Sequence, residues 1–180
     1  MAGTNPAFLV MQEWRHSIDA LIHHACFKKC ITYGIAMNNI NHAEIERVFH
    51  AAPFIRNLGL RLDSVDAGEC RTSLLLVEQH LQHDGYVHAG VQATVADHSA
   101  GVAGSTLVSE GQQVLSAEFK INLLRSAKGS ELRCVAKVLK AGNTLTVVES
   151  EIYCGSGDDF RLVSKATVTL AVVKRRQSSE

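Results

Sequence analysis

The strongest constraint on the fold is the segment 88–108, which consists mainly of alanine, glycine and valine and reads HAGVQATVADHSAGVAGSTLV. Glycine costs a helix about 0.5–1 kcal/mol relative to alanine, so several glycines in one helix need a physical reason. A strongly curved sheet wrapped around a helix supplies one, because little radial room is left for side chains. The alternative is a flexible loop, but the spacing of Val91, Val95 and Val102 and the absence of proline and asparagine favour a helix. The sequence therefore predicts a thin central helix.

The flanking segments predict one further helix and six strands. A helix over 42–56 is expected, with Asn41 as its cap and Pro53 interrupting it. Strands over 58–65 and 70–78 precede the central helix, and strands over 111–124, 131–140, 145–154 and 160–173 follow it. The connecting turns in the second half have hairpin length, which predicts an α+β fold with a largely antiparallel sheet.

The strand 111–124 shows the clearest alternation of apolar and polar residues. The apolar set comprises Leu115, Ala117, Phe119, Ile121 and Leu123, and the polar set comprises Ser116, Glu118, Lys120 and Asn122. Successive side chains of a strand point to opposite faces. We therefore expect the two sets on opposite faces.

The first 36 residues differ in character from the rest of the chain. They hold the single tryptophan, and helical spacing is plausible over 11–27. We expect an N-terminal extension over 1–36, one domain over 37–174 and a polar tail over 175–180. One hypothesis is that Met37 is the true start of the protein.

Charge and composition exclude several classes of protein. Eighteen basic residues balance eighteen acidic ones, so no net field attracts nucleic acid or anionic lipid. No apolar run approaches the roughly 20 residues of a membrane-spanning helix, and we expect no secretory signal, because the apolar run near the N-terminus is short. The five cysteines are widely spread without a CxxC pair, as expected of reduced thiols. These features predict a cytoplasmic protein with neither a nucleic-acid nor a membrane partner.

Asp97 is the most informative polar residue, because it stands in the middle of the small, apolar helix. Burying a carboxylate is costly unless it is paired or hydrogen-bonded, and a helix enclosed by a sheet leaves little room for exposure. The alternative is a solvent-facing side chain beside His98 and Ser99. Asp97 lies roughly 180° around the helix and about 13 Å along it from His88. If both ends of this segment act on one substrate, they belong to different copies of the chain.

The start of the same helix can bind an anion. Unpaired N–H groups at Ala89 and Gly90, with the positive end of the helix dipole behind them, would polarise a carbonyl oxygen or stabilise an oxyanion. Such a site has many uses, so it does not identify a reaction.

Two motifs in the chain resemble those of a known enzyme family. HLQHDGYVHAGVQATVADHSAG, followed by VLSAEFKINLLRSAKG, is similar to the hotdog-fold acyl-CoA thioesterases of the phenylacetate-degradation (PaaI-like) type. The resemblance covers about residues 42–173. It implies a curved antiparallel sheet around a central helix and hydrolysis of a thioester to free CoA and a carboxylic acid. It also implies a homodimer or a homotetramer built as a dimer of dimers, and no cofactor or metal.

The resemblance also implies roles for individual residues. Asp97 would be the catalytic carboxylate, as general base or nucleophile, with Ser116 of the same subunit positioning water. Gln82 would orient the thioester or the water, and His88 would shape the loop or lie near the carbonyl. The Ala89 N–H, followed by Gly90, would polarise that carbonyl. Ala89 departs from the glycine of many relatives, which narrows the space there.

Coenzyme A carries phosphates, so basic residues are expected at the rim of the pocket. Arg125 and Lys128 are the candidates, and a solvated turn explains them equally well.

Three alternatives remain at this stage. A non-catalytic acyl-CoA sensor and a hydroxyacyl-thioester dehydratase or hydratase share the fold, although the first 40 residues look too short for a DNA-binding domain. A metalloenzyme would use His80, His83 and His88, but their spacing is not one of the usual ligand patterns.

Overall fold

The computed structural model describes residues 42–175, which begin with two short helices, α2 (His42–Phe49) and α3 (Pro53–Leu58). Pro53 opens α3, and Gly59 ends it in a left-handed conformation with φ 79°. The expected interruption at Pro53 is therefore confirmed. The expected cap Asn41, the helix over 11–27, the extension 1–36 and the tail beyond residue 175 lie outside the described residues.

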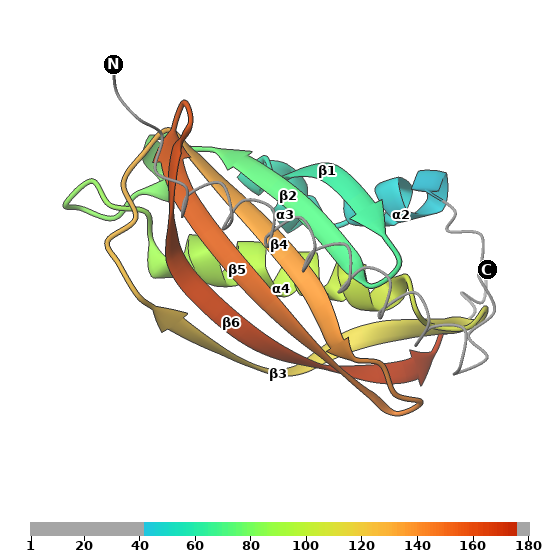
Figure 1. The fold of residues 1–180 in the computed structure, drawn as a ribbon. Helices are drawn as coiled ribbons and strands as arrows, with labels where there is room; N and C mark the ends of the chain where they lie inside the picture. Colours follow the sequence, from blue (N-terminus) through green and yellow to red (C-terminus); the bar gives the residue numbers. More distant parts are fainter. Residues whose placement is uncertain (1–41, 176–180) are drawn as a thin grey trace, which may run out of the picture. The chain divides into compact units, whose positions relative to one another are not determined.

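The described strands form one six-stranded sheet in the order β1-β2-β4-β5-β6-β3, and every neighbouring pair is antiparallel. The strands are β1 (Arg61–Asp66), β2 (Glu69–Leu75), β3 (Gln112–Leu123), β4 (Glu131–Lys140), β5 (Leu145–Ser156) and β6 (Asp159–Lys174). The sheet curves around one long helix, α4 (Ala89–Ser105) (Figure 1). The expected hotdog arrangement is confirmed.

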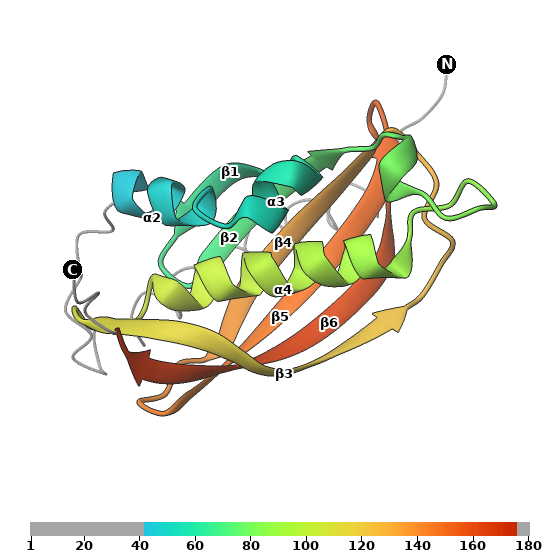
Figure 2. The ribbon, with the colours of Figure 1, turned by 180° about the vertical axis from the view of Figure 1, so that it is seen from behind.

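Helix α4 lies along the concave side of the sheet, as Figure 2 shows from behind. Its sheet-facing side chains are small, and Val95, Ala96, Ala100 and Ala103 are completely buried. At Gly104 an added Cβ would lie less than 3.0 Å from Cδ1 of Leu170 on β6. At Gly101, in contrast, it would meet nothing within 4 Å. Close approach of the sheet therefore explains Gly104 but not Gly101.

Strand β3 contains a β-bulge at Ala117, which corrects the uniform alternation expected for 111–124. Ser116 pairs with Leu170, and Glu118 pairs with the adjacent Thr169, so Ala117 is the extra residue. Before the bulge Ser116 faces α4, and after it Phe119 faces the same side through its pairing with the buried Val168. The apolar and polar sets thus exchange faces within the strand.

Strand β3 is also an edge of the sheet, because it pairs only with β6 among the described strands. Its apolar side chains Leu115, Phe119 and Leu123 are 44–55% exposed. Within residues 42–175, no helix is both long and apolar enough to cross a lipid bilayer.

Candidate active site

Asp97 lies in the middle of α4, on the side that faces β3. The Ser116 hydroxyl donates a hydrogen bond of 2.7 Å to Oδ1 of Asp97. The bulge at Ala117 permits this contact, since it allows Ser116 to face the helix while Glu118 faces outward. Asp97 itself is half-buried, so the expectation of an enclosed carboxylate is wrong for the single chain. The sheet covers the opposite side of α4 and leaves the Asp97 side partly open.

His88 caps the start of α4. Its Nδ1 accepts a hydrogen bond of 2.9 Å from the Gly90 N–H, so the proton of the neutral ring is on Nε2. The prediction that both Ala89 and Gly90 offer free N–H groups is therefore wrong for Gly90. The Ala89 N–H has no acceptor among the described residues, and it remains available to a ligand.

The loop before α4 holds Gln82 in a tight turn. Its side-chain Oε1 accepts from the Asp84 N–H at 2.9 Å, and its backbone N–H donates to the Tyr86 carbonyl at 2.8 Å. The His88 N–H then donates to the His80 carbonyl at 2.9 Å, which ties the loop to the helix start. The Gln82 side-chain amide nitrogen has no acceptor in residues 42–175, so this donor is open to a ligand.

The predicted residues thus form two groups. Asp97 and Ser116 meet at the middle of α4, whereas Gln82, His88 and Ala89 lie in or beside the loop at its start. A helix rises 1.5 Å per residue, so Ala89 and Asp97 are about 12 Å apart along the axis. A single carbonyl group cannot contact both groups of one chain.

A basic pocket of about 350 Å³ opens beside the helix start. Its cationic side chains are Arg125, Lys128 and Arg161, of which Arg161 pairs with Asp159 at 3.3 Å. The Val87 N–H donates to the Ala127 carbonyl at 2.9 Å, so the loop that carries the first two cations adjoins the start of α4. Asp159 itself lines the pocket, and the remaining lining residues are Ser126, Cys154, Gly155, Ser156 and Val163. The pocket suits a ligand with negative charge.

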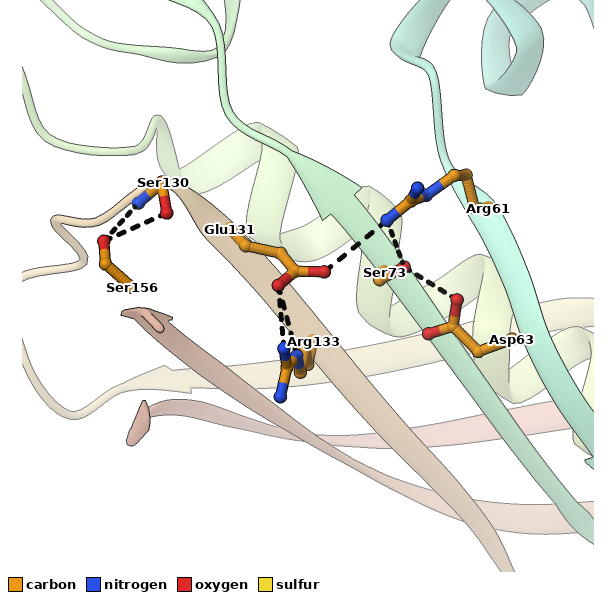
Figure 3. Close-up of polar contacts among 7 residues, drawn as sticks. All are labelled: Arg61, Asp63, Ser73, Ser130, Glu131, Arg133 and Ser156. Atoms are coloured by element: carbon orange, nitrogen blue, oxygen red, sulfur yellow. Dashed lines mark hydrogen bonds and ion pairs between the residues drawn. The ribbon is translucent and has the colours of Figure 1, made fainter. Parts of the chain in front are cut away.

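A second polar network lies near the basic pocket, and its charged side chains pair with one another (Figure 3). Arg61 donates to Ser73 at 3.2 Å and lies 3.6 Å from Glu131, which also pairs with Arg133 at 3.0 Å. Because these charges already have partners, we assign the network to fold stability rather than to binding.

A serine pair beside this network supports the basic pocket. The Ser130 N–H donates to the Ser156 hydroxyl at 3.0 Å, which fixes a lining residue of the pocket (Figure 3).

His98, the neighbour of Asp97, faces the core rather than the open side of α4. Its ring meets the Phe49 ring edge-on, with centroids 4.7 Å apart. Burial lowers the pKa of His98, and the Asp97 charge offsets only part of this effect. His98 therefore joins α2 to α4 as a neutral ring.

Three buried hydroxyl groups under Asp97 escaped the sequence analysis: Thr72, Ser99 and Ser150. Ser150 donates to the Ala96 carbonyl at 2.9 Å, and Ser99 lies 2.7 Å from Thr72. The alternation of the strands could have revealed two of them. Thr72 stands at an inward position of β2 between Cys70 and Leu74, and Ser150 stands at an inward position of β5 between Val148 and Ile152.

Among residues 42–175, no three histidine, cysteine, aspartate or glutamate side chains are grouped so that they could hold a metal ion. His80 and His88, which the metal hypothesis needs, already accept backbone N–H groups through Nδ1.

Comparison with known proteins agrees with the fold. The signature of the thioesterase superfamily matches residues 84–160. A crystal structure of a thioesterase family protein from Silicibacter pomeroyi is 31% identical, with a TM-score of 0.71, over 73% of this chain and 97% of that one. A 1,4-dihydroxy-2-naphthoyl-CoA hydrolase of Listeria monocytogenes is 26% identical over 67% of this chain and 95% of its own length.

A third comparison concerns the expected PaaI-like type. The PaaI protein from the phenylacetic acid degradation operon of E. coli is 17% identical with a TM-score of 0.67, over 77% of this chain and 96% of that one. At this identity the likeness shows a shared fold.

Proposed function

We propose that this chain, which belongs to the thioesterase superfamily, hydrolyses an acyl-CoA thioester to free CoA and a carboxylic acid. The observation that carries the proposal is the Asp97 carboxylate, held by Ser116 at 2.7 Å on the open side of a helix whose first N–H group is unpaired. A carboxylate and an oxyanion donor are the two groups that acyl transfer to water requires.

The proposed reaction follows from the positions of these groups. As general base, Asp97 accepts a proton from a water molecule while that water attacks the thioester carbonyl carbon. The Ala89 N–H donates to the oxyanion that forms, and the C–S bond then breaks and releases the CoA thiolate, which takes up a proton. As nucleophile, Asp97 would attack the carbonyl itself and form an anhydride that water hydrolyses. The Gln82 amide nitrogen is free to orient the thioester or the water.

We further propose that the site forms between two copies of the chain. The separation of about 12 Å between Ala89 and Asp97 prevents one carbonyl from reaching both in one chain. The free edge of β3 and its exposed Phe119 and Leu123 offer a surface for a second copy. Asp97 and Ser116 of one subunit would then meet the helix start of the other. We therefore propose a dimer, or a dimer of dimers.

The basic pocket is the proposed site of the CoA phosphates. Arg125 and Lys128 were candidates from the sequence, and Arg161 is added by the structure. The loop that carries Arg125 and Lys128 adjoins the start of α4. One extended CoA thioester could therefore place its phosphates in the basic pocket and its carbonyl group at Ala89.

The choice of acyl groups for the test comes from the relatives. The Listeria relative is named for an aromatic acyl group, so an aromatic acid is included in the test beside short and medium aliphatic chains.

The test is an assay of free-thiol release across aromatic, short-chain and medium-chain acyl-CoA substrates. A general base contributes typically 10²–10⁴-fold, so we expect Asp97→Asn and Asp97→Ala to lower kcat by about that factor while the far-UV circular dichroism persists. The matched control is Asp66→Asn, an exposed carboxylate at the end of β1, which should keep full turnover. Near-full kcat in the Asp97 variants would contradict the assigned role.

A further inference from the structure

The hydroxyl groups beneath α4 form two directed contacts with consecutive carbonyl groups. Ser99 donates its only hydroxyl hydrogen to the Val95 carbonyl at 2.7 Å, so its oxygen accepts from the Thr72 hydroxyl 2.7 Å away. Ser150 donates to the next carbonyl, that of Ala96, at 2.9 Å. Thr72 and Ser150 come from β2 and β5, so two separate strands contact the helix.

These contacts lie immediately before Asp97 and are fully sealed from water. Thr72, Ser99 and Ser150 are at most 1% exposed. The Cys134 thiol on β4 is also buried, and burial raises its pKa to about 12, so it stays a neutral thiol. The network thus consists of neutral groups whose hydrogen bonds are directional.

Such contacts add to the restraint that packing supplies. Beside Val95, the packed face of the helix carries the small side chains of Ala96, Ala100 and Ala103, so few side chains interlock with the sheet, and hydrogen bonds to the helix backbone help to fix its rotation about its axis. A carboxylate about 5 Å from the axis moves by about 1 Å when the helix turns by roughly 10°. Misplacement by about 1 Å can cost 10²-fold in rate.

We propose that Ser150 and the Thr72–Ser99 pair are positioning residues that set the rotation of α4 and thereby aim the Asp97 carboxylate at the reacting atoms. This inference rests on the proposed thioesterase function. Ser116 holds the carboxylate from the side of β3, and the buried hydroxyl groups hold the backbone beneath it from the opposite side.

The kinetic test compares Ser150→Ala, Thr72→Val and the double variant with Ser164→Ala. Ser164 is the matched control, because it is also completely buried, on β6, but its hydroxyl has no hydrogen-bond partner. We expect kcat to fall about tenfold in each single variant and about 10²-fold in the double variant, with KM within about twofold of the wild type. Ser164→Ala should leave both constants unchanged.

The same changes are then made in the Asp97→Asn background. If the hydroxyl groups act by aiming Asp97, their loss should lower the residual kcat of Asp97→Asn no further. An equal fold-loss in both backgrounds, or losses no larger than that of Ser164→Ala, would overturn the proposal.

Amide hydrogen exchange separates this inference from the proposed function. Amides of residues 97–100 should exchange faster in Ser150→Ala and Thr72→Val than in Ser164→Ala, whatever the substrate. Wild-type protein that cleaves no acyl-CoA of the panel would refute the function, whereas unchanged exchange in all variants would refute the role of the hydroxyl groups.

Discussion

The close approach of β6 to the central helix at Gly104 yields a quantitative prediction. An alanine Cβ at this position would lie below 3.0 Å from Leu170 Cδ1, and the methyl group would have to retreat by roughly 1 Å to reach ordinary carbon–carbon contact. Leu170 has no exposed surface and therefore no free space to enter. Overpacking of this kind costs about 1–3 kcal/mol, while the change from glycine to alanine gains about 0.5–1 kcal/mol in a helix. The difference of these two terms has its centre near 1 kcal/mol, so we expect Gly104→Ala to lower the free energy of unfolding by about 1 kcal/mol and by no more than about 2.5 kcal/mol.

Urea denaturation followed by far-UV circular dichroism measures this change, and a double-mutant cycle assigns its cause. Leu170→Val removes the obstructing Cδ1 atom, so Gly104→Ala should cost at least about 1 kcal/mol less in the Leu170→Val background than in the wild type. A Gly104→Ala protein as stable as the wild type, or strict additivity in the cycle, would refute the explanation of the small-residue helix.

Three further predictions follow from the site and its surroundings. Arg125→Ala and Lys128→Ala should raise KM for an acyl-CoA but not for the corresponding acyl-pantetheine, which lacks the nucleotide phosphates; equal effects on both would place the phosphates elsewhere. Because burial lowers the folded-state pKa of His98 below its unfolded value near 6.5, unfolding takes up a proton in acid. The free energy of unfolding should therefore fall as the pH drops below about 6.5, and His98→Gln should flatten this part of a pH series of urea denaturation curves. In a Cys26→Ser/Cys30→Ser background, Ellman's reagent should find no reactive thiol in the native protein and three after unfolding, since Cys70, Cys134 and Cys154 are at most 4% exposed.

The sequence predicted the architecture closely because its signals are local. The break at Pro53, the small residues of α4 and the hairpin-length turns each report on their own segment, and strands β4 and β5 begin where expected. The motif around Asp97 also placed the carboxylate and Ser116, which the structure joins by a hydrogen bond.

The expectations that failed depend on contacts that no local pattern encodes. The bulge at Ala117 arises from the pairing of β3 with β6, since the strand's own alternation runs through it without a break. The hydrogen bond from the Gly90 N–H to His88 depends on the rotamer of the His88 side chain. The partial exposure of Asp97 depends on where the folded sheet ends. The Ser150 contact joins residues 54 positions apart, so only the folded chain reveals it.

The bulge at Ala117 has a consequence for how β3 tolerates change in chain length. Deleting Ala117 would place Glu118 directly after Ser116 while each kept its present partner on β6, so the ladder would become continuous and every side chain would keep its face. Deleting a residue elsewhere in β3 would instead shift one part of the strand by one position and turn its inner side chains outward. Loss of the extra residue should therefore damage the protein less than loss of either neighbour.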